Sequence, residues 1–216
     1  MKMADGTGQT LSESTYQILS SMIFSRKLPG GKVIEERPLS EELNISRTPL
    51  RYALSRLHGE GMLERLSNGL YMVPVPTIEE YMDLVQLRRI LEGAAAALAA
   101  GRMDPTKLGD LRVRFESMMA QDDVDVAGHF LIDDDLHMAI AEASGNAALH
   151  RTIDSVRRQV RMCNVKRYPG RFKETCAEHL AILDAIGAGD AEGARAALDE
   201  HLDKVWEGFV SNLSKR

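Results

Sequence analysis

The fold of the N-terminal part is decided by residues 46–57, which read Ser46-Arg47-Thr48-Pro49-Leu50-Arg51-Tyr52-Ala53-Leu54-Ser55-Arg56-Leu57. A serine followed by proline in the first turn is typical of a helix N-terminus, because proline lacks an N–H that this turn leaves unbonded anyway. Four apolar residues follow at the i, i+3, i+4, i+7 spacing of one helical face, which predicts that this face packs inward. They are Leu50, Ala53, Leu54 and Leu57.

The other face of this helix carries arginines and hydroxyls. Arg47, Arg51 and Ser55 lie along it, with Thr48 and Tyr52 beside them. Guanidinium groups pair with guanine edges or phosphates, and hydroxyls pair with phosphates, so this face suits the major groove of DNA. An exposed arginine face also fits plain solvation, so the flanking segments decide between the two interpretations.

The flanking segments complete a DNA-binding arrangement. Leu39–Leu43 predicts a short helix, and Asn44-Ile45 predicts a tight turn in which asparagine adopts the left-handed conformation. Helix, short turn and helix form a helix-turn-helix. Downstream, Met62–Leu66 and Leu70–Val73 flank Ser67-Asn68-Gly69, which predicts a β-hairpin that serves as a wing.

Length and cysteine content limit the classes of protein that fit. A chain of 216 residues is long enough for two small domains, each with its own core. Two cysteines, Cys163 and Cys176, together with the lack of a secretory signal, indicate a reducing compartment, so we expect a cytoplasmic protein. No stretch approaches the ~20 apolar residues that a membrane span needs, so we expect no membrane partner.

The net charge of −5 is not spread evenly along the chain. Residues 1–76 hold nine Lys/Arg and eight Asp/Glu, a balance of +1, and the remainder holds 18 against 24, a balance of −6. The acidic surplus therefore lies outside the segment with the arginine-bearing helix. Because the local placement of arginines matters more than the total charge, DNA is not excluded as a partner.

Residues 74–77 are the predicted linker between two domains. Residues 1–10 are polar and predict a disordered start, and residues 11–73 hold the predicted winged helix-turn-helix. The alternating prolines of Val73-Pro74-Val75-Pro76 keep the linker extended. Residues 78–216 form the second predicted domain.

The second domain is predicted to be helical throughout. Its candidate helices cover residues 78–101, 105–120, 125–143, 147–165, 171–187 and 190–213. Six helices joined by short loops predict an antiparallel all-α helical bundle. The expected fold class is therefore mostly α, with a small β-hairpin in the N-terminal domain.

Three of these helices carry a metal-competent side chain on an apolar face. Asp133 and His137 lie one turn apart on a face shared with Phe130, and His179 and His201 lie on the apolar faces of the last two helices. Burying an uncompensated carboxylate and three imidazoles costs several kcal/mol, and one divalent cation would compensate them all. Each of these histidines, taken alone, could also be a core or surface residue whose ring nitrogens have ordinary hydrogen-bond partners. We keep this structural interpretation for the three remaining histidines of the chain. These are His58, His129 and His150.

Four short pieces occur in a recognisable order over roughly residues 11–76. They are Leu28-Pro29-Gly30-Gly31, Glu36-Arg37-Pro38-Leu39-Ser40, Ser46-Arg47-Thr48-Pro49-Leu50-Arg51 and Glu60-Gly61-Met62-Leu63. In this order and spacing they resemble the winged helix-turn-helix domain of the GntR family of bacterial regulators. Three positions depart from the family pattern: Asn44 replaces glycine, Pro38 replaces glutamate, and Tyr52 replaces the glutamate that often follows the arginine. The expected DNA contacts are Arg37, Ser46, Arg47, Thr48, Arg51, Asn68 and Gly69.

A second set of pieces covers the bundle. They are Leu87–Glu92, Asp133-x-x-x-His137, Ala143–Asn146, Glu178–Ile186, Gly189-Asp190-Ala191 and His201-Leu202. These pieces resemble the effector-binding FCD domain of the FadR subfamily. Metal-binding members hold a divalent metal with one aspartate and three histidines, so the resemblance implies the ligands Asp133, His137, His179 and His201. Leu136 replaces the phenylalanine that often precedes the first histidine, and this change keeps the face apolar.

A six-coordinate ion with four protein ligands has two positions left for water or a carboxylate effector. The donor set fits zinc, nickel, manganese or iron alike. Arg88 lies on a largely apolar helix, where we expect it to bind the effector carboxylate in a bidentate manner, and Asn146 is a further pocket candidate. An internal ion pair between Arg88 and Glu92 is the alternative. Arg158, Arg161 and Asn146 are weaker candidates than Arg88.

Two classes of function remain. The first is a ligand-responsive transcription regulator that binds a palindromic operator as a homodimer and senses a small carboxylate through a metal-containing bundle. The second is an enzyme in which the same metal activates water and Glu178 serves as base. Only the regulator explains residues 11–76, so we expect no enzyme. A regulator whose metal is purely structural is a variant of the first class.

Overall fold

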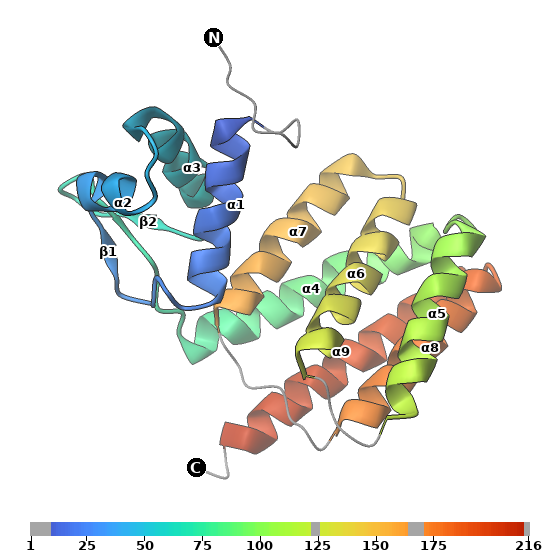
Figure 1. Cartoon of the computed structure of the whole chain (residues 1–216). Coiled ribbons are helices and arrows are strands. Elements are labelled where there is room, and N and C mark those ends of the chain that lie inside the picture. Colours follow the sequence, from blue (N-terminus) through green and yellow to red (C-terminus); the bar gives the residue numbers. More distant parts are fainter. Residues whose placement is uncertain (1–9, 122–125, 164–170, 214–216) are drawn as a thin grey trace. The chain divides into compact units, whose positions relative to one another are not determined.

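The computed structural model describes residues 10–121, 126–163 and 171–213. Within these ranges the chain forms nine helices and one three-stranded sheet, which confirms the mostly α fold class (Figure 1). It divides into two compact units, residues 10–78 with 158–163, and residues 79–157 with 171–213. Among the described residues, we find no helix whose length and hydropathy would suit a membrane span. The predicted disordered start lies, apart from Thr10, outside the described residues.

The first unit contains the predicted helix-turn-helix. Its helices are α1 (Leu11–Phe24), α2 (Glu36–Glu42) and α3 (Arg47–Gly59), and α1 packs against α3. Asn44 has a φ of 51° in the turn before α3, as the turn chemistry predicts. The four apolar residues of the α3 inward face are fully buried, so the periodicity identified the core correctly. These are Leu50, Ala53, Leu54 and Leu57.

The wing hairpin is part of a three-stranded antiparallel sheet. Its strands are β1 (Val33–Ile34), β2 (Glu64–Arg65) and β3 (Tyr71–Met72), in the order β1-β3-β2. The predicted hairpin of β2 and β3 is confirmed, with Glu64 opposite Met72. Strand β1 was not predicted, because two residues are too short to show the alternation that identifies a strand.

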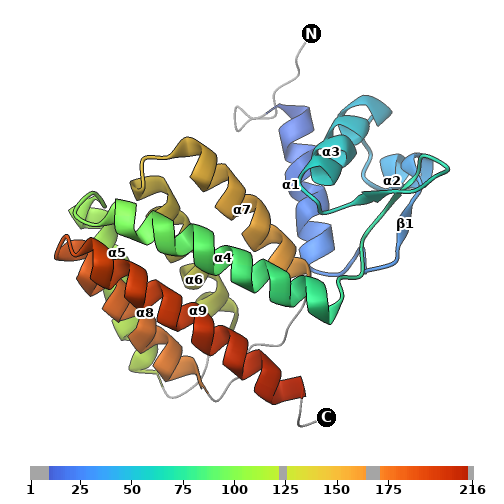
Figure 2. The ribbon, with the colours of Figure 1, turned by 180° about the vertical axis from the view of Figure 1, so that it is seen from behind.

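The second unit holds the predicted bundle of antiparallel helices, except for two short segments. The helices are α4 (Ile78–Ala99), α5 (Pro105–Met119), α6 (Val126–Ala143), α7 (Ala147–Met162), α8 (Phe172–Gly187) and α9 (Ala191–Leu213). Ile78 at the start of α4 and residues 158–162 at the end of α7 belong to the first unit. Helix α8 packs against both α5 and α9. Helix α4 runs along α9, where the Tyr81 ring lies 4.4 Å from the Phe209 ring (Figure 2). Buried apolar side chains of α6, α8 and α9 lie together in one hydrophobic core.

The inward face of α6 is turned relative to the prediction. Phe130, expected to point inward, is 36% exposed, whereas the adjacent His129 is 4% exposed. The buried positions of α6 include Ile132, Asp133, Leu136, His137 and Ile140. The inward face of α6 therefore includes His129 and excludes Phe130. Asp133 and His137 both lie on this inward face, as predicted.

Candidate metal centre and DNA-binding face

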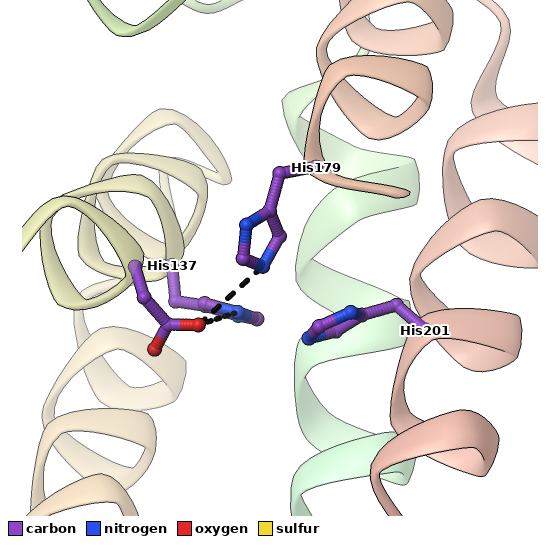
Figure 3. Close-up of side chains that lie close together, drawn as sticks. His137, His179 and His201 are labelled. Carbon is purple, nitrogen blue, oxygen red and sulfur yellow. Dashed lines mark ion pairs between the residues drawn. The ribbon is translucent and has the colours of Figure 1, made fainter. Parts of the chain in front are cut away.

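Three helices bring four metal-competent side chains to one point. Asp133 and His137 lie one helical turn apart on α6, His179 lies on α8, and His201 lies on α9. Each is at most 2% exposed, and one ligand atom from each lies within 4.8 Å of the others. Figure 3 shows the three imidazole rings converging between the helices. The residues that the sequence singled out on three separate helices thus form one cluster.

Hydrogen bonding leaves the centre of this cluster unsatisfied. Among the described residues, neither ring nitrogen of His179 and neither ring nitrogen of His137 has a hydrogen-bond partner of good geometry. Nε2 of His179 lies 3.4 Å from Oδ1 of Asp133, and Nε2 of His137 lies 3.8 Å from the same oxygen. A buried polar group without a partner is costly, and one cation would take one nitrogen from each ring together with the Asp133 carboxylate. The imidazole and carboxylate donors therefore fit a divalent metal ion.

Two of the histidines, His137 and His179, have lowered pKa values. Burial, reinforced by the nearby Arg157 guanidinium, lowers the pKa of His137 to about 4. Burial and the adjacent His201 hold the pKa of His179 well below its ordinary value. Both rings are therefore neutral at pH 7. Neutral imidazole is the form that coordinates a metal, so no proton has to be removed from these two rings before binding.

A second buried carboxylate, Glu92 on α4, contacts this cluster. Burial alone would raise the pKa of Glu92, but the guanidinium groups of Arg88 and Arg157 outweigh it and hold that pKa well below the ordinary range. One oxygen of Glu92 lies against Nδ1 of His137. The carboxylates of Asp133 and Glu92 therefore balance the guanidinium groups of Arg88 and Arg157 in charge.

Arg157 on α7 was not among the predicted site residues. Its Nη2 donates to Oδ2 of Asp133 at 3.0 Å, and its Nη1 lies 3.7 Å from Oε1 of Glu92. That Nη1 is buried and has no hydrogen-bond partner in the described part of the chain. Ile153, Val156 and Arg157 follow the i, i+3, i+4 spacing of one helical face, and all three are buried. The apolar-face criterion that found Asp133 and the histidines would therefore also have found this arginine.

The two predicted effector contacts have intramolecular partners. Nε and Nη2 of Arg88 donate to the two carboxylate oxygens of Glu92, at 2.7 and 3.3 Å, so the structure shows the internal ion pair given as the alternative. Asn146 is exposed and caps α7, because its Oδ1 accepts from the backbone N–H groups of Ala148 and Leu149. The structure thus places Arg88 beside the cluster, through Glu92, and Asn146 at the exposed start of α7.

Two aromatic groups enclose His179. The ring of Phe115 lies 4.8 Å from it, and the ring of His129 stacks at 6.0 Å. His129 was expected to be a structural residue, and its ring also contacts Phe172 at 4.9 Å. It is buried beside the cluster but is not one of the four residues whose ligand atoms converge.

The predicted DNA contacts lie on the surface of the first unit. Ser46, Arg47, Thr48 and Arg51 are exposed at the N-terminal end of α3. Nε of Arg51 donates to Glu36 at 2.7 Å. This arrangement presents hydroxyls and guanidinium groups together at the start of a helix whose opposite face is buried.

The remaining predicted contacts flank this face. Arg37 on α2 is exposed and pairs with Glu41 at 3.0 Å. Asn68 and Gly69 form the tip of the wing, where Gly69 has a φ of 83° and Oδ1 of Asn68 accepts from the N–H of Leu70. A side chain other than glycine would be strained at this φ.

Both units match known families. Residues 11–70 match the bacterial regulatory proteins of the gntR family, and residues 83–204 match the FCD domain. The "Putative L-lactate dehydrogenase operon regulatory protein" of Escherichia coli K12 is 31% identical, with 95% of this chain and 87% of that protein covered. The Nta operon transcriptional regulator of Aminobacter aminovorans is 29% identical, with 88% of this chain and 90% of that protein covered.

The fold also matches solved structures. The structure of E. coli McbR/YncC has a TM-score of 0.78 at 23% identity and covers 98% of this chain and 100% of its own, which shows likeness of fold. The matched families and named relatives are transcriptional regulators and not enzymes. The chain is therefore a transcription regulator that belongs to the GntR family of bacterial regulatory proteins and carries an FCD domain.

Proposed function

We propose that the chain is a ligand-responsive, cytoplasmic regulator of the FadR subfamily that binds a palindromic operator as a homodimer. Residues 11–73 read the operator, residues 74–77 link the domains, and residues 78–216 bind the metal and a small carboxylate effector. The observation that carries the proposal is the buried cluster of Asp133, His137, His179 and His201 in a chain that also has an exposed arginine-bearing recognition helix.

The metal supplies a Lewis-acid position for an anionic ligand. Asp133, His137, His179 and His201 would hold zinc, nickel or manganese, and a six-coordinate ion held by these four ligands would have two positions left for a small carboxylate. Arg157 is the guanidinium group best placed to reinforce such binding, because its buried Nη1 has no hydrogen-bond partner among the described residues. Arg88 has its hydrogen bonds to Glu92 already, so its role is to hold that carboxylate beside His137.

The small number of base pairs that one winged domain contacts supports a homodimer. A single recognition helix contacts too few base pairs for useful specificity, so two copies on two half-sites are needed. Helix α4 offers an apolar surface for this purpose, with Leu87, Ile90 and Leu98 exposed along it. The effector controls DNA binding only if its affinity differs between the DNA-competent and the incompetent dimer.

A thermal-shift experiment with and without metal tests the sensor. L-lactate is the first probe, because the E. coli relative is named for an L-lactate dehydrogenase operon. A panel of other small carboxylates follows. A carboxylate that raises the Tm of the zinc-loaded protein, leaves the Tm of the metal-free protein unchanged and weakens or strengthens operator binding supports the proposal. A metal that raises the Tm by itself, with no carboxylate of the panel bound, supports the structural-metal variant instead.

A further inference from the structure

A glutamate outside the four-ligand set contacts one of the ligands. Oε2 of Glu178 lies 2.9 Å from Nδ1 of His201, and the Glu178 side chain is 9% exposed. Glu178 directly precedes His179 on α8. Because successive helical residues point about 100° apart, His179 reaches into the cluster while Glu178 reaches the side of α9 that carries His201. One helix therefore supplies both a ligand and the partner of another ligand.

Two cations hold the other oxygen of Glu178. Oε1 accepts from Nη2 of Arg171, and Nζ of Lys204 lies 3.7 Å from the same atom. Arg171 also donates through Nη1 to the backbone carbonyl of Lys204 at 2.7 Å, which ties the start of α8 to α9. Glu178 is thus fixed on one side by Arg171 and Lys204, and its Oε2 is turned to His201.

From this geometry we propose that Glu178 is a positioning residue for the metal ligand His201. It accepts the Nδ1–H of His201, which fixes the neutral tautomer in which Nε2 carries the lone pair. With Nδ1 engaged, Nε2 is the atom of His201 available to a cation, and the ring points toward His137 and His179 in Figure 3. The inference rests on the proposed metal site and adds a residue that acts on it through His201.

A carboxylate also lies behind the ring of His137, although this contact does not have hydrogen-bond geometry. Nδ1 of His137 lies against a carboxylate oxygen of Glu92, as Nδ1 of His201 lies against Glu178. A carboxylate behind a ligating imidazole fixes its orientation and raises its basicity. The two glutamates differ in their surroundings, since Glu92 is buried between Arg88 and Arg157 whereas Glu178 is tied to the surface residues Arg171 and Lys204. Replacement of Glu178 therefore disturbs the interior less than replacement of Glu92.

The test measures zinc affinity of the full-length protein by competition with a chromogenic chelator. We expect Glu178→Ala to weaken zinc binding roughly 10–100-fold. Glu178→Gln keeps an oxygen acceptor for the Nδ1–H, so it restores most of the affinity. Glu200→Ala is the matched control, because Glu200 also pairs with Lys204 but does so on the exposed side of α9. This control is expected to bind zinc as the wild type does.

A second readout needs no variant at position 178. Long-range ¹H–¹⁵N NMR of the metal-free wild type, with the His201 signals assigned from the spectrum of His201→Ala, reports the tautomer directly. The proposal predicts the Nδ1–H tautomer of His201, and a predominantly Nε2–H ring overturns it even if Glu178→Ala does not fold. Zinc affinity of Glu178→Ala within twofold of wild type also overturns it and leaves the metal site intact. A wild type that binds no zinc overturns the metal site and this inference together.

Discussion

Oδ2 of Asp133 accepts a hydrogen bond from Nη2 of Arg157 at 3.0 Å, and both side chains are more than nine-tenths buried. A proposed metal ligand is therefore already paired with a guanidinium group before any cation binds. Breaking a buried pair by removing one partner leaves an uncompensated charge, which costs about 3–5 kcal/mol. A bound cation would take over part of that compensation, because it carries the same sign of charge as the arginine.

The first prediction follows from this pair. Arg157→Met should lower the free energy of unfolding of the metal-free protein by about 3–5 kcal/mol, and by clearly less in the presence of zinc. Urea denaturation with and without zinc measures both values. Arg151→Met, on an exposed position of the same helix, is the control and should change little. An equal loss in the two conditions would show that the metal and Arg157 do not share Asp133.

The second prediction concerns the exposed face of α3. Arg47→Ala and Arg51→Ala should each weaken binding to a selected operator duplex by about 1–3 kcal/mol while the bundle stays folded. Fluorescence anisotropy at two salt concentrations measures the loss. Arg89→Ala, a half-exposed arginine of α4, is the control. Unchanged operator affinity in both α3 variants would contradict the assignment of this helix.

The flanking contacts should behave differently from the α3 arginines. Arg37 and the wing tip at Asn68 are expected to contact phosphates and not base edges. Arg37→Ala and Asn68→Ala should therefore weaken binding less, and the loss should shrink as salt rises. The same anisotropy titrations with a scrambled duplex of equal length separate the two kinds of contact. Base-specific losses at either position would overturn the assignment.

The third prediction concerns assembly. Sedimentation equilibrium at micromolar concentration should show a dimer, with and without operator DNA. Ile90→Glu, at the most exposed apolar position of α4, should shift the equilibrium toward monomer, because it places a charge in an apolar contact. Val113→Glu, equally exposed on α5, is the control for a general effect of added charge. A wild type that stays monomeric would contradict the homodimer.

The fourth prediction concerns the first unit at high pH. Burial, and then the hydrogen bond to Glu60, raises the pKa of Tyr16 to about 12 from 10.0. Between these values the folded state keeps a proton that the unfolded state releases, so stability is present below pH 10 and is lost as the pH rises through about 12. Tyr16→Phe lacks this titration and should lose stability less steeply there. Parallel slopes for the two proteins would contradict the shifted pKa.

Much of the fold and of the candidate site was predictable because both depend on periodicity. Leu50 and Leu57 mark a helix face by spacing alone, and the same spacing places His179 and His201 toward the interior. The φ of Asn44 follows from the ability of its side chain to support a left-handed turn. Such features depend on neighbours within a few residues, which the sequence displays directly.

Other features depend on pairs that are distant in sequence. The contact of Arg157 with Asp133 joins two helices, and that of Glu178 with His201 joins two others. Periodicity gives the face of each residue but not its partner across the interior. Strand β1 is defined by its pairing with β3 and not by its own residues. The burial of His129 in place of Phe130 on α6 likewise depends on packing against the other helices.

The metal content of the reconstituted protein tests the central claim most directly. After incubation with zinc and removal of unbound metal, elemental analysis of the wild type and of His150→Ala should give about one ion per chain, whereas His179→Ala and His201→Ala should have lost most of it. His150 lies on α7 outside the cluster and controls for incidental loss of a histidine. Equal metal content in all four proteins, or none in the wild type, would contradict a shared site at Asp133, His137, His179 and His201, and the proposed sensor with it.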